Sequence, residues 1–336
     1  MGEESVARAA QPPTFSVLMA AYQAEATVAR AVRSVIAQTR DDWELIVVDD
    51  GSTDSTFDRA VAAAAGDPRV VVVREENCGA ATARNVAAEH ARGELLCILD
   101  SDDAYEPIYL ERMGELASSA SEVGFFSCNG ICVNPDGSRV PWLTPRRFQR
   151  TQSFSLAQLI HANDVFIMSA VRAEVFRAVG GFDTELTACE DYDLWLRLLE
   201  AGVGHRYTPD CLGVYYRSGG SVSAGGVTVA LMTARILSRL VDTGRLTRRE
   251  RRAARARIRA SLSRAELERR RIERDFEISR RDAFNTVDAF GSRTRRLYAR
   301  LLVTVSPGYY IRVVSGRRDE QLSTLYGAGG ADSDDG

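Results

Sequence analysis

Three aspartates within four residues, Asp100, Asp102 and Asp103, follow the apolar run Leu95–Leu99. Carboxylates packed this closely repel one another and are costly to desolvate, and a hard divalent cation with oxygen ligands removes that cost. Mg²⁺ and Mn²⁺ commonly take one or two carboxylates together with substrate phosphates. The cluster therefore predicts a Mn²⁺ or Mg²⁺ site for a diphosphate. A short motif of this kind also occurs as a solvated turn capped by aspartate.

Two further polar segments precede that cluster in the chain. Asp50 lies in a second acidic turn, where a carboxylate can accept from a base N–H or from ribose hydroxyls. Asn77 and Arg84 flank the start of a helix that Gly79 opens, and a helix N-terminus with a guanidinium attracts phosphate. Taken alone, Arg84 also fits an ordinary cation on a helix surface.

Apolar runs alternating with helical patterns must position these side chains. The apolar runs predict strands at 15–20, 43–48, 70–73 and 95–99. The patterns between them predict helices at 26–38 and 79–91, and a further helix that begins near Ser52 or Asp54 and ends at Ala65. Near-continuous apolar strands with crossover helices indicate an α/β fold with a mostly parallel sheet. Ligands in such sheets bind beyond the carboxyl ends of the strands, where Tyr22, Asp50, Asn77 and the aspartate cluster fall.

The pattern is less regular from residue 104 to 225. Val165–Val171 predicts a further strand, and Glu190–Leu198 predicts a helix whose first residues are acidic. Thr27 is expected to cap the first helix, Ser52 or Asp54 the second, and Thr247 with Glu250 forms a capping box before a long helix.

The chain resembles the inverting family 2 glycosyltransferases, which have the GT-A nucleotide-diphospho-sugar transferase fold. The resemblance covers about residues 15–223 and rests on motifs in the family's order, at Ser16–Glu25, Ser34–Thr39, Val47–Asp54, Asn77–Asn85, Gly93–Asp103, Gly180–Asp183 and Glu190–Asp191. It implies GT-A architecture, with a mostly parallel central sheet flanked by helices, and a C-terminal helical extension.

The resemblance also implies roles for individual residues. Those expected to bind the donor are Ala20, Tyr22, Asp50, Asn77, Arg84 and Asp100. Asp102 would hold the metal, with Asp103 shaping its loop, and Asp191 would be the general base, with Glu190 as the competing candidate. The family often has a histidine near Ser218, which this chain lacks, and Arg217 would then contact phosphate instead.

These roles describe a metal-dependent transfer of sugar from a nucleotide diphosphate, by family analogy a UDP-sugar, to a hydroxyl with inversion. The expected acceptor is a carbohydrate or a lipid-linked sugar in the synthesis of surface polysaccharide or glycolipid. Two alternatives stay open. One is a catalytically silent nucleotide-sugar-binding protein with a helical interaction arm, and the other is a sugar nucleotidyltransferase, which releases pyrophosphate.

Charge divides the 336-residue chain into unequal parts. Residues 1–225 hold 19 Arg and 32 acidic residues, whereas residues 226–336 hold 24 Arg and 14 acidic residues. We therefore predict a disordered segment at 1–14, the transferase domain at 15–225, an Arg-rich helical extension at 226–300, an amphipathic segment at 301–326 and a disordered tail at 327–336.

The Arg-rich extension admits three interpretations: a solvated face, a homodimer seam or peripheral contact with an anionic inner membrane. A hydrophobic stripe at Ile258, Leu262, Ala265, Ile272, Phe276 and Ala283 fits either a helical hairpin or a dimer seam. Nucleic acid is not expected as a partner, because aromatic residues are not interleaved with the arginines and glutamates are. The N-terminal residues lack the apolar stretch of a secretory signal, and no run is long enough to span a bilayer, so a cytoplasmic location is expected.

Overall fold

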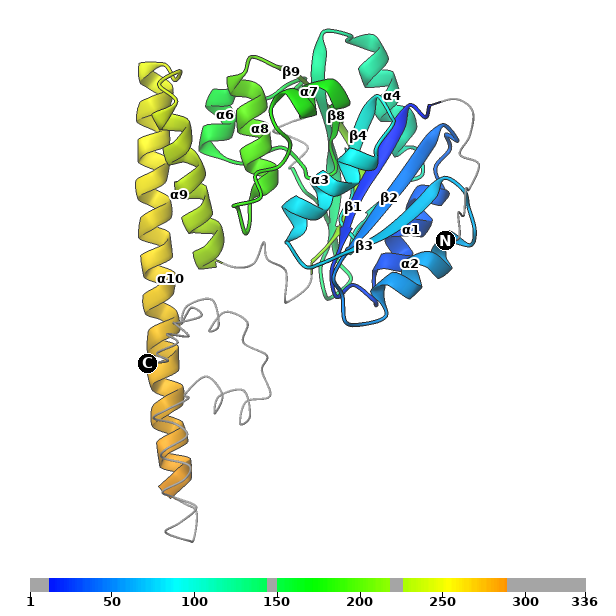
Figure 1. Ribbon diagram of the computed structural model, residues 1–336. Helices are drawn as coiled ribbons and strands as arrows, with labels where there is room; N and C mark the ends of the chain where they lie inside the picture. Colours follow the sequence, from blue (N-terminus) through cyan, green and yellow to red (C-terminus); the bar gives the residue numbers. More distant parts are fainter. Residues whose placement is uncertain (1–11, 144–149, 218–225, 289–336) are drawn as a thin grey trace, which may run out of the picture. The chain divides into compact units, whose positions relative to one another are not determined.

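The alternating pattern of the first hundred residues folds into a sheet with helices on both faces (Figure 1). The computed structural model describes residues 12–143, 150–217 and 226–288, with side chains up to Arg270. Its nine-stranded sheet has the order β3-β2-β1-β4-β8-β6-β9-β5, and β7 pairs with β6 outside this path. The first four strands in this order are parallel to one another, whereas β8 is antiparallel to both β4 and β6.

The strands are β1 (Phe15–Ala21), β2 (Trp43–Asp50), β3 (Val70–Glu75), β4 (Leu95–Ile98), β5 (Ala104–Tyr105), β6 (Val123–Val133), β7 (Arg139–Pro141), β8 (Ala170–Arg172) and β9 (Gly204–Tyr216). The helices are α1 (Val28–Ile36), α2 (Thr56–Ala64), α3 (Ala80–His90), α4 (Tyr109–Ser119), α6 (Leu156–His161), α7 (Ala173–Ala178), α8 (Glu190–Glu200), α9 (Gly226–Asp242) and α10 (Arg248–Asp288). The four early strands, their connecting helices and α8 confirm the predicted α/β class.

Two hydrophobic clusters cover the two faces of the sheet, because successive side chains of a strand point to opposite sides. Along β1, Val17 and Met19 pack with residues of α1 and α4, whereas Leu18 packs with residues of α3, α6 and α8. Every residue of β2 is buried, which explains its continuous apolar run. Because both faces of the sheet are covered, the polar loops lie at the edge formed by the carboxyl ends of the parallel strands.

The predicted strand at Val165–Val171 is wrong, since only Ala170–Arg172 forms a strand there. Phe166 and Met168 are fully buried outside any ladder, where they pack against backbone. A Cβ placed on Gly130 would lie 2.3 Å from the Phe166 ring, and one on Gly213 would lie 2.1 Å from the Met168 sulfur. The apolar run therefore fills space above two strand glycines instead of adding a strand.

Helix starts agree with the sequence in part. Gly79 precedes α3 and the Thr247–Glu250 capping box is present, with Glu250 N–H donating to the threonine hydroxyl at 3.2 Å. Thr27 makes no side-chain cap, and its hydroxyl donates to the Ala24 carbonyl instead. The predicted cap at Ser52 or Asp54 is wrong, since the N-cap of α2 is Ser55, which makes no side-chain cap, while Asp54 accepts from the Thr56 amide at 3.0 Å from one residue earlier.

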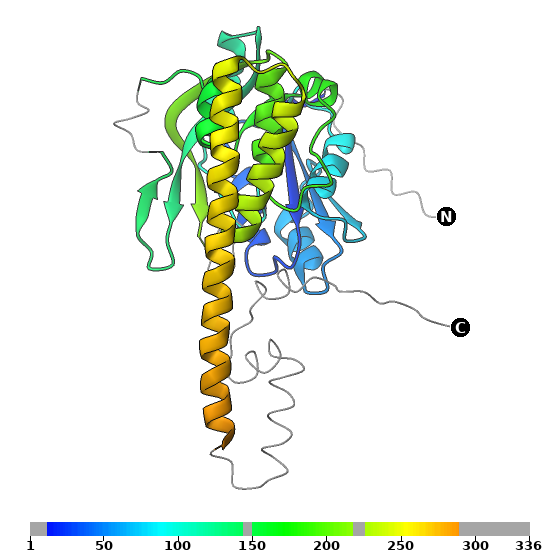
Figure 2. The ribbon, with the colours of Figure 1, turned by 90° about the vertical axis from the view of Figure 1, so that its left-hand side faces the viewer.

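The chain divides into two compact units. The first comprises residues up to 224 together with Leu231–Ser261, and the second comprises Gly225–Ala230 and the residues from Leu262 onward. Within the first unit, α9 and the first turns of α10 lie side by side (Figures 1 and 2), and Leu237 and Ala254 join its core. The domain boundaries stay predictions, and those at 1–11, 289–300, 301–326 and 327–336 lie outside the described residues.

In the described part of the stripe proposed as a dimer seam, Ala265 is buried and Leu262 is exposed, and the later members lie beyond the described side chains. Among the described residues, no helix combines the length and the hydropathy needed to cross a bilayer.

Candidate functional site

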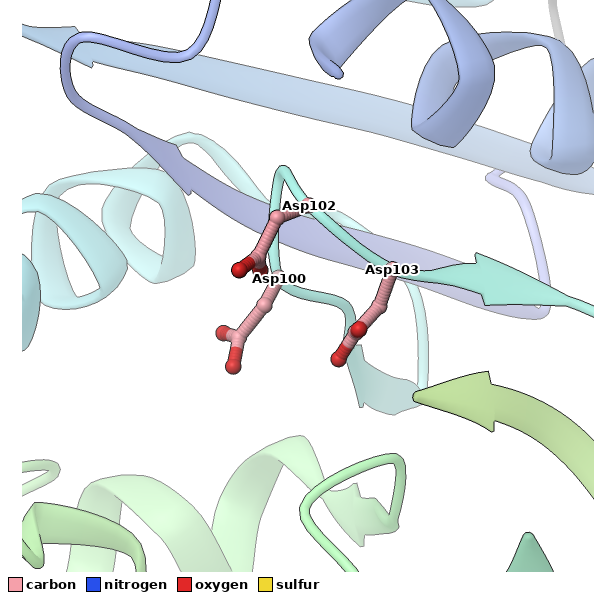
Figure 3. Close-up of side chains that lie close together, drawn as sticks. All are labelled: Asp100, Asp102 and Asp103. Atoms are coloured by element: carbon pink, nitrogen blue, oxygen red, sulfur yellow. The ribbon is translucent and has the colours of Figure 1, made fainter. Parts of the chain in front are cut away.

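The three aspartates lie in the loop between β4 and β5, and their carboxyl groups project to the same side of it (Figure 3). One oxygen from each of Asp100, Asp102 and Asp103 lies within 4.8 Å of the others. Asp103 is fully buried, and its Oδ1 accepts a hydrogen bond from the Tyr216 amide at 2.9 Å. The loop thus gathers three acidic groups that the sequence placed at the end of a parallel strand.

Burial and mutual repulsion make it energetically costly to ionise all three carboxyl groups of this cluster without a bound cation. Burial, and then the neighbouring charge of Asp100, raise the pKa of Asp102, and the same two causes raise the pKa of Asp103 well above its usual range. The Oδ2 atom of Asp103 is buried and has no hydrogen-bond partner among the described residues. A divalent cation would satisfy that oxygen and offset the repulsion, so these residues fit a Mg²⁺ or Mn²⁺ ion.

Arg84 of α3 links this loop to α8. Its guanidinium donates to Asp100 Oδ1 and to Glu190 Oε1, at 2.5 Å each, and the side chain is only 6% exposed. Because a buried charge is costly unless it is paired, the two carboxylates stabilise the guanidinium, and the guanidinium in turn fixes the separation of the two carboxylates. The structure therefore brings Arg84, Asp100 and Glu190 together, although Arg84 and Glu190 lie 106 residues apart in the sequence.

The two acids that open α8 differ in their surroundings. Glu190 is paired with Arg84, whereas Asp191 accepts one hydrogen bond from Asn163 Nδ2 at 3.2 Å. Burial, and then the charge of Glu190, raise the pKa of Asp191 to about 6. An acid with a pKa in this range alternates between proton acceptor and donor near neutral pH, while Glu190 is committed to an ion pair.

The predicted nucleoside side is built on the ends of β1 and β2. Asp50 is buried and accepts from the amides of Cys78 and Gly79 at 2.8 and 2.9 Å, while Asn77 Nδ2 donates to the Asp50 carbonyl at 3.0 Å. The Asp50 carboxylate therefore holds the start of α3 against β2. Ala20 is half-buried in β1, and Tyr22, which follows it, is 52% exposed.

The end of β9 approaches the aspartate cluster through its backbone. Tyr216 donates its amide to Asp103, whereas the next residue, Arg217, is exposed and donates to Asn134 Oδ1 at 3.1 Å. Among the described residues, neither Arg217 nor Tyr22 contacts the three aspartates, so their predicted roles rest on the resemblance. The loop at 218–223 lies outside the described residues.

Comparison with known proteins gives the same family as the motifs. Residues 16–180 match the family described as Glycosyl transferase family 2. The chain belongs to this family. A putative glycosyltransferase, EpsH of Bacillus subtilis, is 39% identical over 119 residues, which cover 35% of this chain and 34% of EpsH. This family 2 chain thus matches only about a third of that relative's length.

Two further similarities extend over more of the chain. The UDP-Glc:alpha-D-GlcNAc-diphosphoundecaprenol beta-1,3-glucosyltransferase WfaP of Escherichia coli is 28% identical over 62% of this chain and 79% of its own. The mannosyltransferase PcManGT of Pyrobaculum calidifontis, solved with GDP-Man and Mn²⁺, aligns with a TM-score of 0.60. That alignment covers 90% of this family 2 chain and 81% of the other at 19% identity, and it confirms the GT-A fold.

Two residues that the sequence did not single out contact this site of the family 2 chain. Arg30 of α1 donates to the Asp102 carbonyl, and its guanidinium lies 3.7 Å from the centroid of the Tyr216 ring. Asn163 contacts Asp191 from the segment between α6 and β8. Arg30 lies beside the apolar stripe of a predicted helix, which only weakly indicates that its side chain reaches the site. Asn163 lies in an irregular segment, where no sequence pattern indicates which side chains point into the site.

Proposed function

We propose that this family 2 chain transfers a sugar from a nucleotide-diphosphate sugar to a hydroxyl acceptor, with a divalent cation and with inversion at the anomeric carbon. The observation that carries the proposal is the ion-paired bridge of Arg84. It joins the loop of three aspartates to the start of α8, where a carboxyl group with a raised pKa lies. The Arg84 ion pairs thereby fix the candidate site for a metal–diphosphate relative to the candidate base.

In this proposal Asp102, with Asp103, holds the cation, and Asp100 reaches the ribose. Asp50, Asn77 and Arg84 form the nucleoside pocket with the Ala20 backbone and the Tyr22 ring, and Arg217 contacts phosphate. WfaP uses a UDP-sugar by name, whereas PcManGT was solved with GDP-Man and Mn²⁺. We propose Mn²⁺ or Mg²⁺ and a UDP-sugar.

For the acceptor, we propose a carbohydrate or a lipid-linked sugar in the synthesis of bacterial surface polysaccharide, because WfaP acts on a diphosphoundecaprenol-linked sugar by name. We place the reaction in the cytoplasm, where nucleotide sugars are available.

The proposed reaction needs one proton acceptor and one leaving group. The acceptor oxygen forms a bond to the anomeric carbon on the face opposite the diphosphate, the bond to the diphosphate oxygen breaks, and Asp191 takes the hydroxyl proton. A bound divalent cation would neutralise charge on the departing nucleoside diphosphate. Asn163 Nδ2 donates to Oδ2 of Asp191, and in this proposal Oδ1 of the same carboxylate takes the proton.

A panel of UDP-, GDP- and dTDP-sugars tested with Mn²⁺ separates this proposal from its alternatives. Metal-dependent release of a nucleoside diphosphate, by hydrolysis or by transfer, supports it. Donor binding without any turnover, across a panel of glycan and lipid-linked acceptors, supports the silent binding protein. Release of pyrophosphate supports the nucleotidyltransferase.

The raised pKa of Asp191 predicts an acid limb in the pH–rate profile. Because only the ionised carboxylate accepts a proton, kcat should fall about tenfold per pH unit below about pH 6. Measuring kcat from pH 5 to 8 at saturating donor and Mn²⁺ checks this expectation. A rate that stays flat down to pH 5 contradicts Asp191 as the base.

Asn163→Ala should move that acid limb to higher pH. The asparagine N–H stabilises the ionised form of Asp191, so its removal raises the pKa of the carboxyl group and lowers kcat at pH 6 more than at pH 8. Gln152→Ala, which removes an exposed side-chain amide from the segment before α6, serves as the matched control. An unchanged limb in Asn163→Ala contradicts the positioning role.

A further inference from the structure

Five arginines lie along one face at the start of α10, within the first compact unit. They line a common hollow and are Arg248, Arg251, Arg252, Arg255 and Arg259. Their spacing of three or four residues places them on one side of the helix, over about 16 Å of its length at 1.5 Å per residue. We call this set the arginine face.

The opposite side of these turns is fixed to the transferase unit. Ala254 and Ser261 are buried, and Ile258 and Ala253 pack against the core cluster that contains α8. Arg251 is anchored as well, since its Nη2 donates to the Leu246 carbonyl at 3.2 Å. The arginine face is therefore presented outward by a helix whose other side is held in place.

The charge of the arginine face is not offset within the described part of the chain. Arg248, Arg252, Arg255 and Arg259 are exposed, and none has a carboxylate within 4.0 Å among the described residues, whereas Arg269 and Arg270 further along α10 pair with Glu266. Like charges three and four residues apart destabilise a helix. An external anion bound across several of them would remove that repulsion.

We propose that the arginine face docks the enzyme on a bilayer that contains anionic phospholipids. Guanidinium groups bind phosphate through two parallel N–H donors, and an array on one helix face presents several of them to one surface. Basic residues near such a surface each contribute to binding. The described residues from Arg248 to Arg259 include no aromatic side chain, so the base stacking used to bind single-stranded nucleic acid has no platform there.

Sedimentation with lipid vesicles tests this proposal without any assay of transfer. The full chain should bind vesicles of equal phosphatidylcholine and phosphatidylglycerol at 50 mM salt, bind phosphatidylcholine alone weakly, and be released at 0.5 M salt. Arg252→Gln with Arg255→Gln should lower the partition coefficient about 30-fold. Circular dichroism and the melting temperature establish that the variant is folded.

Arg33→Gln with Arg59→Gln is the matched control, since it removes two exposed arginines from α1 and α2. This control should retain nearly all of the vesicle binding. The proposal is overturned if the two double variants lose binding equally or if the wild-type chain ignores anionic vesicles. Binding to duplex DNA or to an acidic polysaccharide in place of vesicles also overturns it.

Discussion

Asp191→Asn should lower the rate of glycosyl transfer about 10²–10⁴-fold, because the amide cannot accept the hydroxyl proton of the acceptor. Donor affinity should change little, since Asp191 contacts Asn163 and not the loop of three aspartates. The measurement is kcat for transfer beside the dissociation constant for donor with Mn²⁺. Loss of donor binding in step with kcat would contradict the assignment.

The same variant should be more stable than the wild type. Burial raises the pKa of Asp191 from 3.8 to about 6, so ionising it costs the folded state free energy at every pH above about 6 and none below about 4. At about 1.4 kcal/mol per pKa unit, the gain is at most about 3 kcal/mol at pH 7. A higher melting temperature together with lost transfer separates a lost base from a damaged fold.

Asp58→Asn is the matched control for both measurements, since Asp58 is exposed on α2. It should leave kcat and the melting temperature unchanged. If Asp191→Asn instead melted well below this control, the loss of activity would be structural.

Asp102→Asn should lower metal-dependent transfer at least about 100-fold, because stabilisation of the leaving diphosphate by a cation amounts to several kcal/mol. Two negative groups, Asp100 and Asp103, would remain beside the neutral amide, so Mn²⁺ should still bind, but more weakly. Titrating activity with Mn²⁺ should therefore show a higher half-saturating concentration and partial recovery at excess metal.

The control for the metal is Asp136→Asn, an exposed aspartate in the turn after β6. It should leave the Mn²⁺ dependence of turnover as it is in the wild type. Wild-type Mn²⁺ dependence and full turnover in Asp102→Asn would remove Asp102 from the proposed cation site.

The edge of the sheet was predictable because its signals are local. A buried parallel strand needs apolar residues on both faces, so β1, β2 and β4 stand out as apolar runs, and polar residues at or just after their carboxyl ends mark where each strand ends. Asp50, Asn77 and the aspartate loop were placed at one edge by this reasoning alone, and a hydrogen bond joins the first two.

Contacts across the sequence were not predictable in this way. Nothing near Arg84 indicates that its two partners are Asp100 and Glu190, because that pairing depends on how α3 packs against α8. Phe166 and Met168 gave a false strand, since the glycines that make room for them lie on β6 and β9. Asn163 reaches Asp191 from an irregular segment, where no periodicity marks which side chain points inward.

The most direct test of the proposed metal-assisted, inverting transfer is the anomeric configuration of its product. With the active donor from the panel, Mn²⁺ and a hydroxyl acceptor, NMR coupling constants report the new linkage while the released nucleotide is quantified. An α-linked donor should give a β-linked product and one nucleoside diphosphate per sugar transferred. A product that keeps the α configuration, or release of pyrophosphate, would contradict the account.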